Sequence, residues 1–160
     1  FPNKRALYEA VVSELFGGMF GSIREALEAP GRPLANALED AIESFLEYVW
    51  ARPAAAHILL QEAARRGDHS QAFRALARPA MDYLRAFLEK GQRTGELRPI
   101  TTGPEHFASM VIGSTIFFVG ALPSLLPSLP YDPLSREQLE AHKRDLLRVT
   151  RRLLGLRVRT

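Results

Sequence analysis

The chain has 160 residues, of which 46% are hydrophobic and 24% charged, a composition that supports one globular domain and excludes a disordered chain or a small disulfide scaffold. Cysteine is absent, so disulfides, thiolate zinc sites and cysteine nucleophiles are excluded. The 21 basic and 18 acidic residues leave a net charge of +3, which is weak evidence for nucleic-acid binding. We expect a cytoplasmic location, because the first residues lead into a helical pattern without an apolar signal region.

Proline and glycine residues divide the chain into six segments, and none shows the strict alternation of a half-buried strand, so we predict an all-α bundle of six or more antiparallel helices. Asn3 is a suitable N-cap for a first helix that ends before Pro30. A second helix follows Pro33 and closes at Arg52, directly before Pro53. Its apolar face carries Leu34, Leu38, Ala41, Ile42, Phe45 and Val49, and another face carries Glu39, Glu43 and Glu47.

The middle of the chain is punctuated by helix stops and caps. A short third helix is expected to stop at Gly67. Either Asp68 or Ser70 caps a fourth helix that continues to about Thr94, and Pro79 should kink it early.

Two further helices are predicted in the last third of the chain. The fifth begins near Thr102 to Pro104 and continues to about Leu122. The sixth begins at a capping box formed by Ser135 and Gln138 and ends at Gly155.

No charged residue occurs from Phe107 to Tyr131, a run long enough to cross a bilayer. Serine, threonine and proline residues interrupt the run, and its nearest flanking charges, Glu105 and Asp132, are acidic rather than the basic anchors of a membrane helix. We therefore expect no membrane partner, and interpret the segment as a helix that is covered on every side.

The last two helices are predicted to form a four-helix bundle with the same helices of a second copy, giving a homodimer. Small residues on the fifth helix permit close approach, and the sixth carries a heptad-like seam. The expected interface residues are Ser109, Gly113, Gly120, Leu139, His142, Leu146, Val149 and Leu153. The alternative is that the seam packs only within one subunit.

Catalytic and metal-binding patterns are absent from the sequence. The four histidines fall on four different segments without metal-ligand spacing, and no nucleophile elbow or phosphate-binding loop occurs, so we expect no metal, no cofactor and no enzymatic activity. Gly17, Gly18 and Gly21 lie inside the first helix, where each costs roughly 1 kcal/mol relative to alanine. They either border a cavity or permit tight packing.

The start of the chain, Phe1-Pro2-Asn3-Lys4-Arg5-Ala6-Leu7 followed by Ala10-Val11-Val12, resembles the signature of TetR-type transcriptional regulators at the junction between the DNA-binding head and the fourth helix of the family. Ala51-Arg52-Pro53 and the turn Gly95-Glu96-Leu97-Arg98-Pro99 are similar to later segments of that family, though more loosely. By helix order the resemblance covers the whole chain, and by motif only its first dozen residues.

The resemblance implies that residues 1–160 are a single ligand-binding and dimerisation domain, with residues 1–8 ending the junction to a helix-turn-helix head that these residues do not include. Operator DNA would bind through that head, and Lys4 at the start of the first helix would contact the DNA backbone. The implied function is that of a repressor released from its operator by a small apolar effector.

For the effector we expect a pocket among the first five helices, lined mostly by apolar side chains with Gln61 and Ser114 as polar members. The candidate residues are Phe20, Ile23, Phe45, Val49, Leu60, Gln61, Met81, Leu84, Met110, Ser114 and Phe117. The alternative function is a helical-bundle lipid or small-molecule carrier, or an enzyme, without a DNA-binding role.

Overall fold

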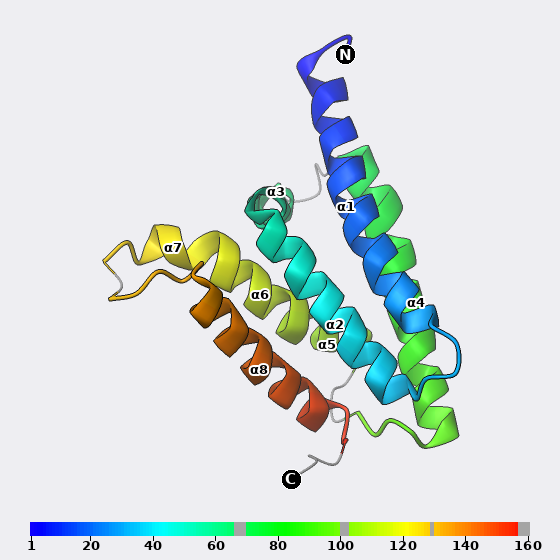
Figure 1. The fold of residues 1–160 in the computed structure, drawn as a ribbon. Coiled ribbons are helices and arrows are strands. Elements are labelled where there is room, and N and C mark those ends of the chain that lie inside the picture. The colour runs from blue at the N-terminus through cyan, green and yellow to red at the C-terminus, as the bar shows by residue number, and fades with distance from the viewer. Residues whose placement is uncertain (66–69, 100–102, 129, 157–160) are drawn as a thin grey trace.

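Helices are the regular elements of the computed structural model, which describes residues 1–65, 70–99, 103–128 and 130–156 (Figure 1). Within these ranges the all-α prediction is confirmed. The elements are α1 (Lys4–Glu28), α2 (Leu34–Ala51), α3 (Pro53–Ala64), α4 (Gln71–Thr94), α5 (Pro104–Ala108), η1 (Ser109–Gly113), α6 (Ser114–Ile116), η2 (Phe117–Ala121), α7 (Leu122–Leu125) and α8 (Arg136–Leu153). The expected stop at Gly67, the cap at Asp68 and the start at Thr102 lie outside the described residues.

Three of the helices begin at side-chain caps that the sequence indicates. The side chain of Asn3 accepts a hydrogen bond from the Ala6 N–H at 2.8 Å, and Ser70 accepts one from Phe73 at 3.1 Å. Ser135 accepts one from the Gln138 N–H at 3.5 Å. The capping box is only half formed, because the Ser135 N–H donates to a backbone carbonyl, that of Asp132.

The elements from α5 to α7 form one continuous helix, Pro104–Leu125, which we call the α5–α7 helix. It contains two π-helical segments, η1 and η2, in which the hydrogen bonds span five residues. Among the described residues it is the one helix long and apolar enough to cross a membrane by length and composition, a criterion that core helices of soluble proteins also meet.

The core of the domain is organised around α2, which lies between α1 and α8 (Figure 1). The whole predicted apolar face of α2 is buried, and Phe45 and Val49 are at most 2% exposed. Val12, Phe16 and Met19 of α1 pack into the same core. Each fully buried Leu, Ile or Phe contributes roughly 1.5–3 kcal/mol, so this contact contributes strongly to the stability of the fold.

The acidic face of α2 makes ion pairs with α8. Arg151 donates two hydrogen bonds to the carboxylate of Glu39, at 2.7 and 2.8 Å, in the bidentate geometry that favours this pair. Two turns before Arg151 on α8, the Nζ of Lys143 lies 3.3 Å from the Glu43 carboxylate. The two pairs therefore fix how α8 lies along α2.

The turn after α4 connects three separate elements. The Glu96 carboxylate accepts a hydrogen bond from the Leu34 N–H at 2.9 Å, and so caps α2, whose own N-cap residue is a proline. Leu97 is 1% exposed, and the Arg98 N–H donates to the Leu154 carbonyl at the end of α8 at 2.8 Å. The turn thereby joins the start of α2 to the ends of α4 and α8.

Gly155 and Gly95 provide a matched test of this tie, because both have a positive φ, of 65° and 76°. A Cβ on Gly155 would lie 2.5 Å from the Arg98 carbonyl oxygen, whereas a Cβ on Gly95 would meet nothing within 4 Å. We expect Gly95→Ala to cost about 1–2 kcal/mol of backbone strain, and Gly155→Ala to cost about 1–3 kcal/mol more. Urea denaturation measures both, and equal losses would contradict the close contact with Arg98.

Candidate functional site

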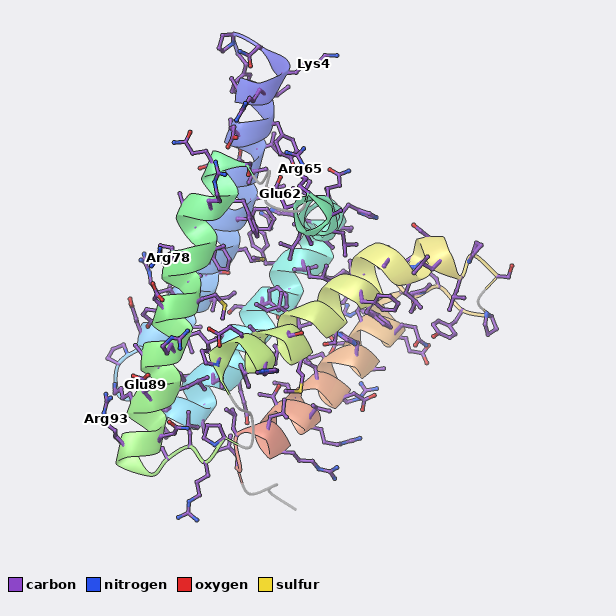
Figure 2. The ribbon with its side chains drawn as sticks, turned by 180° about the vertical axis from the view of Figure 1, so that it is seen from behind. Lys4, Glu62, Arg65, Arg78, Glu89 and Arg93 are labelled. Carbon is purple, nitrogen blue, oxygen red and sulfur yellow. The ribbon has the colours of Figure 1, made fainter. Side chains whose placement is uncertain are left out.

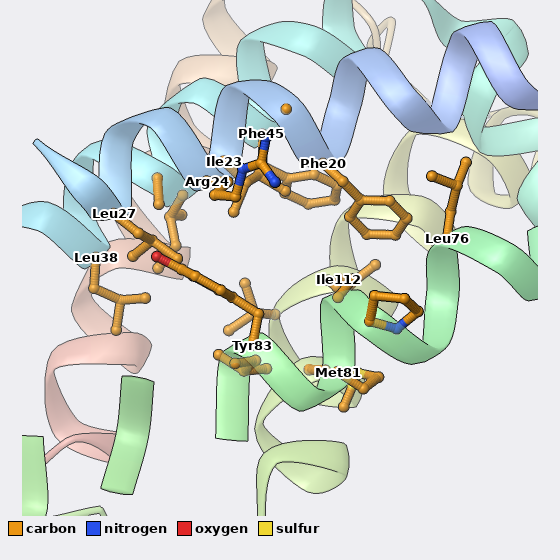
Figure 3. Close-up of a pocket in the computed structure, with 18 of the residues that line it drawn as sticks. Phe20, Ile23, Arg24, Leu27, Leu38, Phe45, Leu76, Met81, Tyr83 and Ile112 are labelled. Atoms are coloured by element: carbon orange, nitrogen blue, oxygen red, sulfur yellow. The ribbon is translucent and has the colours of Figure 1, made fainter. Parts of the chain in front are cut away.

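A cavity of about 440 Å³ lies between α1, α2, α4 and the first half of the α5–α7 helix (Figure 3). Its walls are mostly apolar. They are formed by Gly17, Phe20, Gly21, Ile23, Arg24 and Leu27 of α1, by Leu38, Ala41, Ile42 and Phe45 of α2, by Ala75, Leu76, Pro79, Ala80, Met81, Tyr83 and Leu84 of α4, and by Phe107, Ala108, Val111 and Ile112. The size and the apolar lining are those of a small-molecule site.

The three glycines inside α1 serve two different purposes. A Cβ on Gly18 would lie 2.8 Å from the Tyr48 hydroxyl, so this glycine permits tight packing between α1 and α2. Gly17 and Gly21 line the cavity, and a Cβ on either would meet nothing within 4 Å. Both explanations offered by the sequence therefore hold, each for different residues.

The polar groups among the described lining residues are Arg24 and Tyr83, which extend from facing helices. The Tyr83 side chain reaches from α4 toward α1, where the charges of Glu28 and Arg24 act on its phenol (Figure 3). Burial raises the pKa of Tyr83, and the negative charge of Glu28 raises it further, so the phenol stays neutral.

The structure brings five of the eleven residues predicted for the ligand together in this cavity: Phe20, Ile23, Phe45, Met81 and Leu84. The other six do not line it. Val49 is a fully buried core residue, Leu60 packs beside Gly120, and Gln61 is exposed on α3. Met110, Ser114 and Phe117 lie on the exposed side of the α5–α7 helix.

That exposed side forms a continuous surface, which we call the α5–α7 strip and define as Ser109, Met110, Gly113, Ser114 and Phe117. Phe117 is 51% exposed and Met110 is 39% exposed. Only 33% of the most apolar stretch of the helix is buried. An exposed apolar strip of this kind is typical of a surface that a partner covers.

Gly120 does not belong to the strip, although a regular helical period places it there. A Cβ on Gly120 would lie 3.0 Å from Ala56 and 3.1 Å from Leu60, so Gly120 permits a close contact with α3. The π-helical segments explain the difference, because a wider turn rotates each residue less than 100°. Exposed positions accordingly recur every fourth residue, at Ser109, Gly113 and Phe117.

The predicted seam of α8 is divided between the core and the surface. Leu139, Leu146 and Leu153 are buried within the subunit, whereas Val149 is 46% exposed. His142 is half-buried: it stacks on Phe118 and its Nε2 lies 3.1 Å from the Thr115 hydroxyl oxygen, so it joins α8 to the α5–α7 helix. Burial lowers the pKa of His142, so the neutral imidazole is favoured there.

A buried carboxylate joins α1 to α3 and to the start of α4. Glu62 of α3 is 0% exposed; it accepts hydrogen bonds from the Tyr8 hydroxyl at 2.7 Å and from the Ser70 N–H at 2.8 Å. Arg65 lies 3.5 Å from the same carboxylate, and its guanidinium stacks over the Tyr8 ring at 4.5 Å (Figure 2). Burial and the hydrogen bond to Glu62 together raise the pKa of Tyr8 to about 12.

Glu9 strengthens this junction from the next position of α1. Its carboxylate accepts hydrogen bonds from the Gln71 and Ala72 N–H groups at 3.0 and 2.8 Å, at the positive end of the α4 dipole. We call Tyr8, Glu9, Glu62, Arg65 and Ser70 the α1 junction. Beyond it the first turn of α1 projects from the bundle, with Lys4 exposed near its end (Figure 2).

Sequence reasoning missed Arg24, Tyr83 and the α1 junction. One signal was present for Arg24, because it follows Gly17, Phe20 and Gly21 at helical spacing. Glu62 lacked such a signal, since a glutamate on an amphipathic helix is ordinarily exposed. Its partners Tyr8 and Ser70 are distant in the sequence.

The comparisons with known proteins give one match. Residues 35–149 match the family model described as "Tetracyclin repressor-like, C-terminal domain". Neither the search of curated proteins nor the search of solved structures finds a match. Among the described residues, no group of three or more His, Asp or Glu side chains is placed to hold a metal ion.

The α1 junction predicts a specific dependence of stability on pH. Burial alone would raise the pKa of Glu62, but the hydrogen bonds from Tyr8 and Ser70 and the charge of Arg65 outweigh it, so the pKa lies below 4.5. Below pH 4.5 the unfolded chain therefore binds more protons at Glu62 than the folded chain. Stability should be lost as the pH falls through this range.

We expect Glu62→Gln to flatten this loss and to destabilise the protein at pH 7 by about 1–3 kcal/mol, because the amide satisfies the Tyr8 and Ser70 donors less well. Denaturation curves at several pH values measure both effects. Glu14→Gln is the control, since exposed Glu14 on α1 makes no described contact of this kind. An unchanged pH dependence in Glu62→Gln would show that the junction does not hold this carboxylate.

Proposed function

The chain belongs to the tetracyclin repressor-like C-terminal domain family, and from this premise we propose that it senses a small effector for a repressor that the effector releases from operator DNA. Domains of this family belong to regulators and provide ligand binding and dimerisation. The protein would act in the cytoplasm as a homodimer. A helix-turn-helix head on the N-terminal side of α1 would bind the operator, with Lys4 against the DNA backbone.

The observation that carries this proposal is that α1 and α4 share both the cavity and the α1 junction. Both helices line the cavity, through Phe20 and Gly21 on α1 and through Leu76 and Leu84 on α4. Nearer the N-terminal end of α1, Glu9 joins this helix to the first turn of α4. A ligand that separates the two helices at the cavity would therefore act on the junction and on the projecting turn of α1.

Such coupling requires that the effector bind one position of α1 more tightly than the other. The change in operator affinity then equals the difference in effector affinity between the two positions. In a homodimer, a shift of both α1 helices would alter the spacing of the two DNA-binding heads. The same heads could then no longer match two half-sites one helical turn apart.

We propose that the second copy covers the α5–α7 strip together with Val149 of α8. The strip contains small residues that permit close helix approach, and Phe117 supplies the bulk. His142 fixes the two helices to one another within the subunit through Phe118 and Thr115. Two such rigid helix pairs related by a two-fold axis would form a four-helix bundle.

Filling the cavity tests the effector site. Gly21→Leu places a side chain in the open space. The replacement of a glycine inside a helix also stabilises α1 by roughly 1 kcal/mol. With 1-decanol as the probe, the wild-type melting temperature should rise, by an amount equivalent to ~2.7 kcal/mol at a hundredfold excess over Kd. Gly21→Leu should lose this rise and stay folded.

Ser13→Leu is the matched control, because it adds the same side chain to an exposed position of α1 outside the cavity. It should keep the wild-type response to 1-decanol. A response that survives in Gly21→Leu would place the binding of the probe elsewhere.

Charge at the α5–α7 strip tests the dimer. Phe117→Arg and Val149→Arg would each bury an unpaired charge in the proposed interface, at a cost of about 3–5 kcal/mol for each desolvated charge. Sedimentation at micromolar concentration should show a dimer for the wild type and a monomer for both variants. Leu7→Arg, at a position 45% exposed on α1, should remain dimeric. A wild-type monomer would refute the interface.

A further inference from the structure

Among the described residues that line the cavity, Arg24 carries a charge and the others are uncharged. It lies on the exposed side of α1, at the edge of a space that is otherwise bordered by apolar groups such as Phe20 and Leu84. Figure 3 shows Arg24 on α1 together with the apolar lining residues Phe20, Ile23 and Leu27 of the same helix. A cation at the edge of an apolar cavity is suited to a ligand with a charged end and an apolar body.

The donors of Arg24 are not used by a described carboxylate. No ion pair joins Arg24 to a described acidic residue, and this includes Glu28, one turn further along α1. A guanidinium group has five N–H donors, arranged so that two of them match the two oxygens of a carboxylate. These donors are available to a ligand.

We propose that the effector is an amphipathic molecule with one carboxylate, which pairs with Arg24 while an apolar chain fills the cavity. The inference rests on the proposed function, because it concerns the same cavity. One arginine balances one negative charge, and no second cation lines the described walls to balance a doubly charged phosphate. A cationic end is disfavoured, because it would meet the like charge of Arg24.

Three probes with the same apolar chain separate the contribution of the charged end to affinity from that of the chain: decanoate, 1-decanol and decylamine. Each is used below its micelle concentration at pH 7.5. Calorimetric titration of the 160-residue chain should show decanoate binding roughly tenfold tighter than 1-decanol, as expected for a charge-assisted bidentate pair. Decylamine should bind more weakly than 1-decanol.

The variants assign this preference to Arg24. Arg24→Gln should reduce decanoate affinity to that of 1-decanol, and Arg24→Glu should reverse the order so that decylamine binds best. Arg78→Gln is the matched control, because Arg78 is exposed on α4, outside the cavity and without a described ion pair (Figure 2). It should keep the wild-type preference. Circular dichroism checks that each variant is folded, and Arg24→Lys, which retains the charge, should keep part of the preference.

The outcomes distinguish the inference from the proposed function. Equal binding of decanoate and 1-decanol, or a decanoate preference that survives in Arg24→Gln, would overturn the role of Arg24 and leave the cavity proposal intact. Failure of all three probes to bind the wild type would overturn both.

Discussion

The apolar face of α2 must be covered on both sides, and the positions of the other helices follow from this requirement. Phe45 and Val49 are buried where α1 packs against α2, and the acidic edge of the same helix pairs with Arg151 and Lys143 of α8. Even the start of α2 depends on a distant residue, because Glu96 supplies the cap that Pro33 cannot provide. The helix that contributes most apolar surface thus determines where the rest of the chain lies.

Packing is tight along most of α1 and open at one place. Gly18 lets α1 approach Tyr48 closely, whereas Gly17 and Gly21 border the cavity. At the other end of α1, hydrogen bonds and ion pairs replace apolar contacts, through Glu9 and Glu62. Directional contacts of this kind hold one geometry, whereas apolar contacts tolerate sliding, so a displacement near the cavity has a defined point to act on.

Local patterns in the sequence predict much of the fold: the helix ends at Asn3, Ser70 and Gly155 follow from short-range capping chemistry, and the buried face of α2 follows from its period. Features that depend on distant contacts could not be predicted. Gly120 faces α3 because the α5–α7 helix departs from 3.6 residues per turn, which no local pattern reveals. Met110, Ser114 and Phe117 lie on the same helix and do not line the cavity, because a regular period assigns them to the wrong face.

Substitution of Gly17 or Gly21 would change which ligands fit this cavity. Both have ordinary helical geometry and free space where a side chain would begin, so a substitution there reduces the volume of the cavity without a clash at the first side-chain atom. Each change from glycine also favours the helix by a fraction of a kcal/mol up to about 1 kcal/mol. Variation at these two positions can therefore retune the size of the accepted molecule in single steps that cost no stability, a route open both to natural divergence and to the design of biosensors.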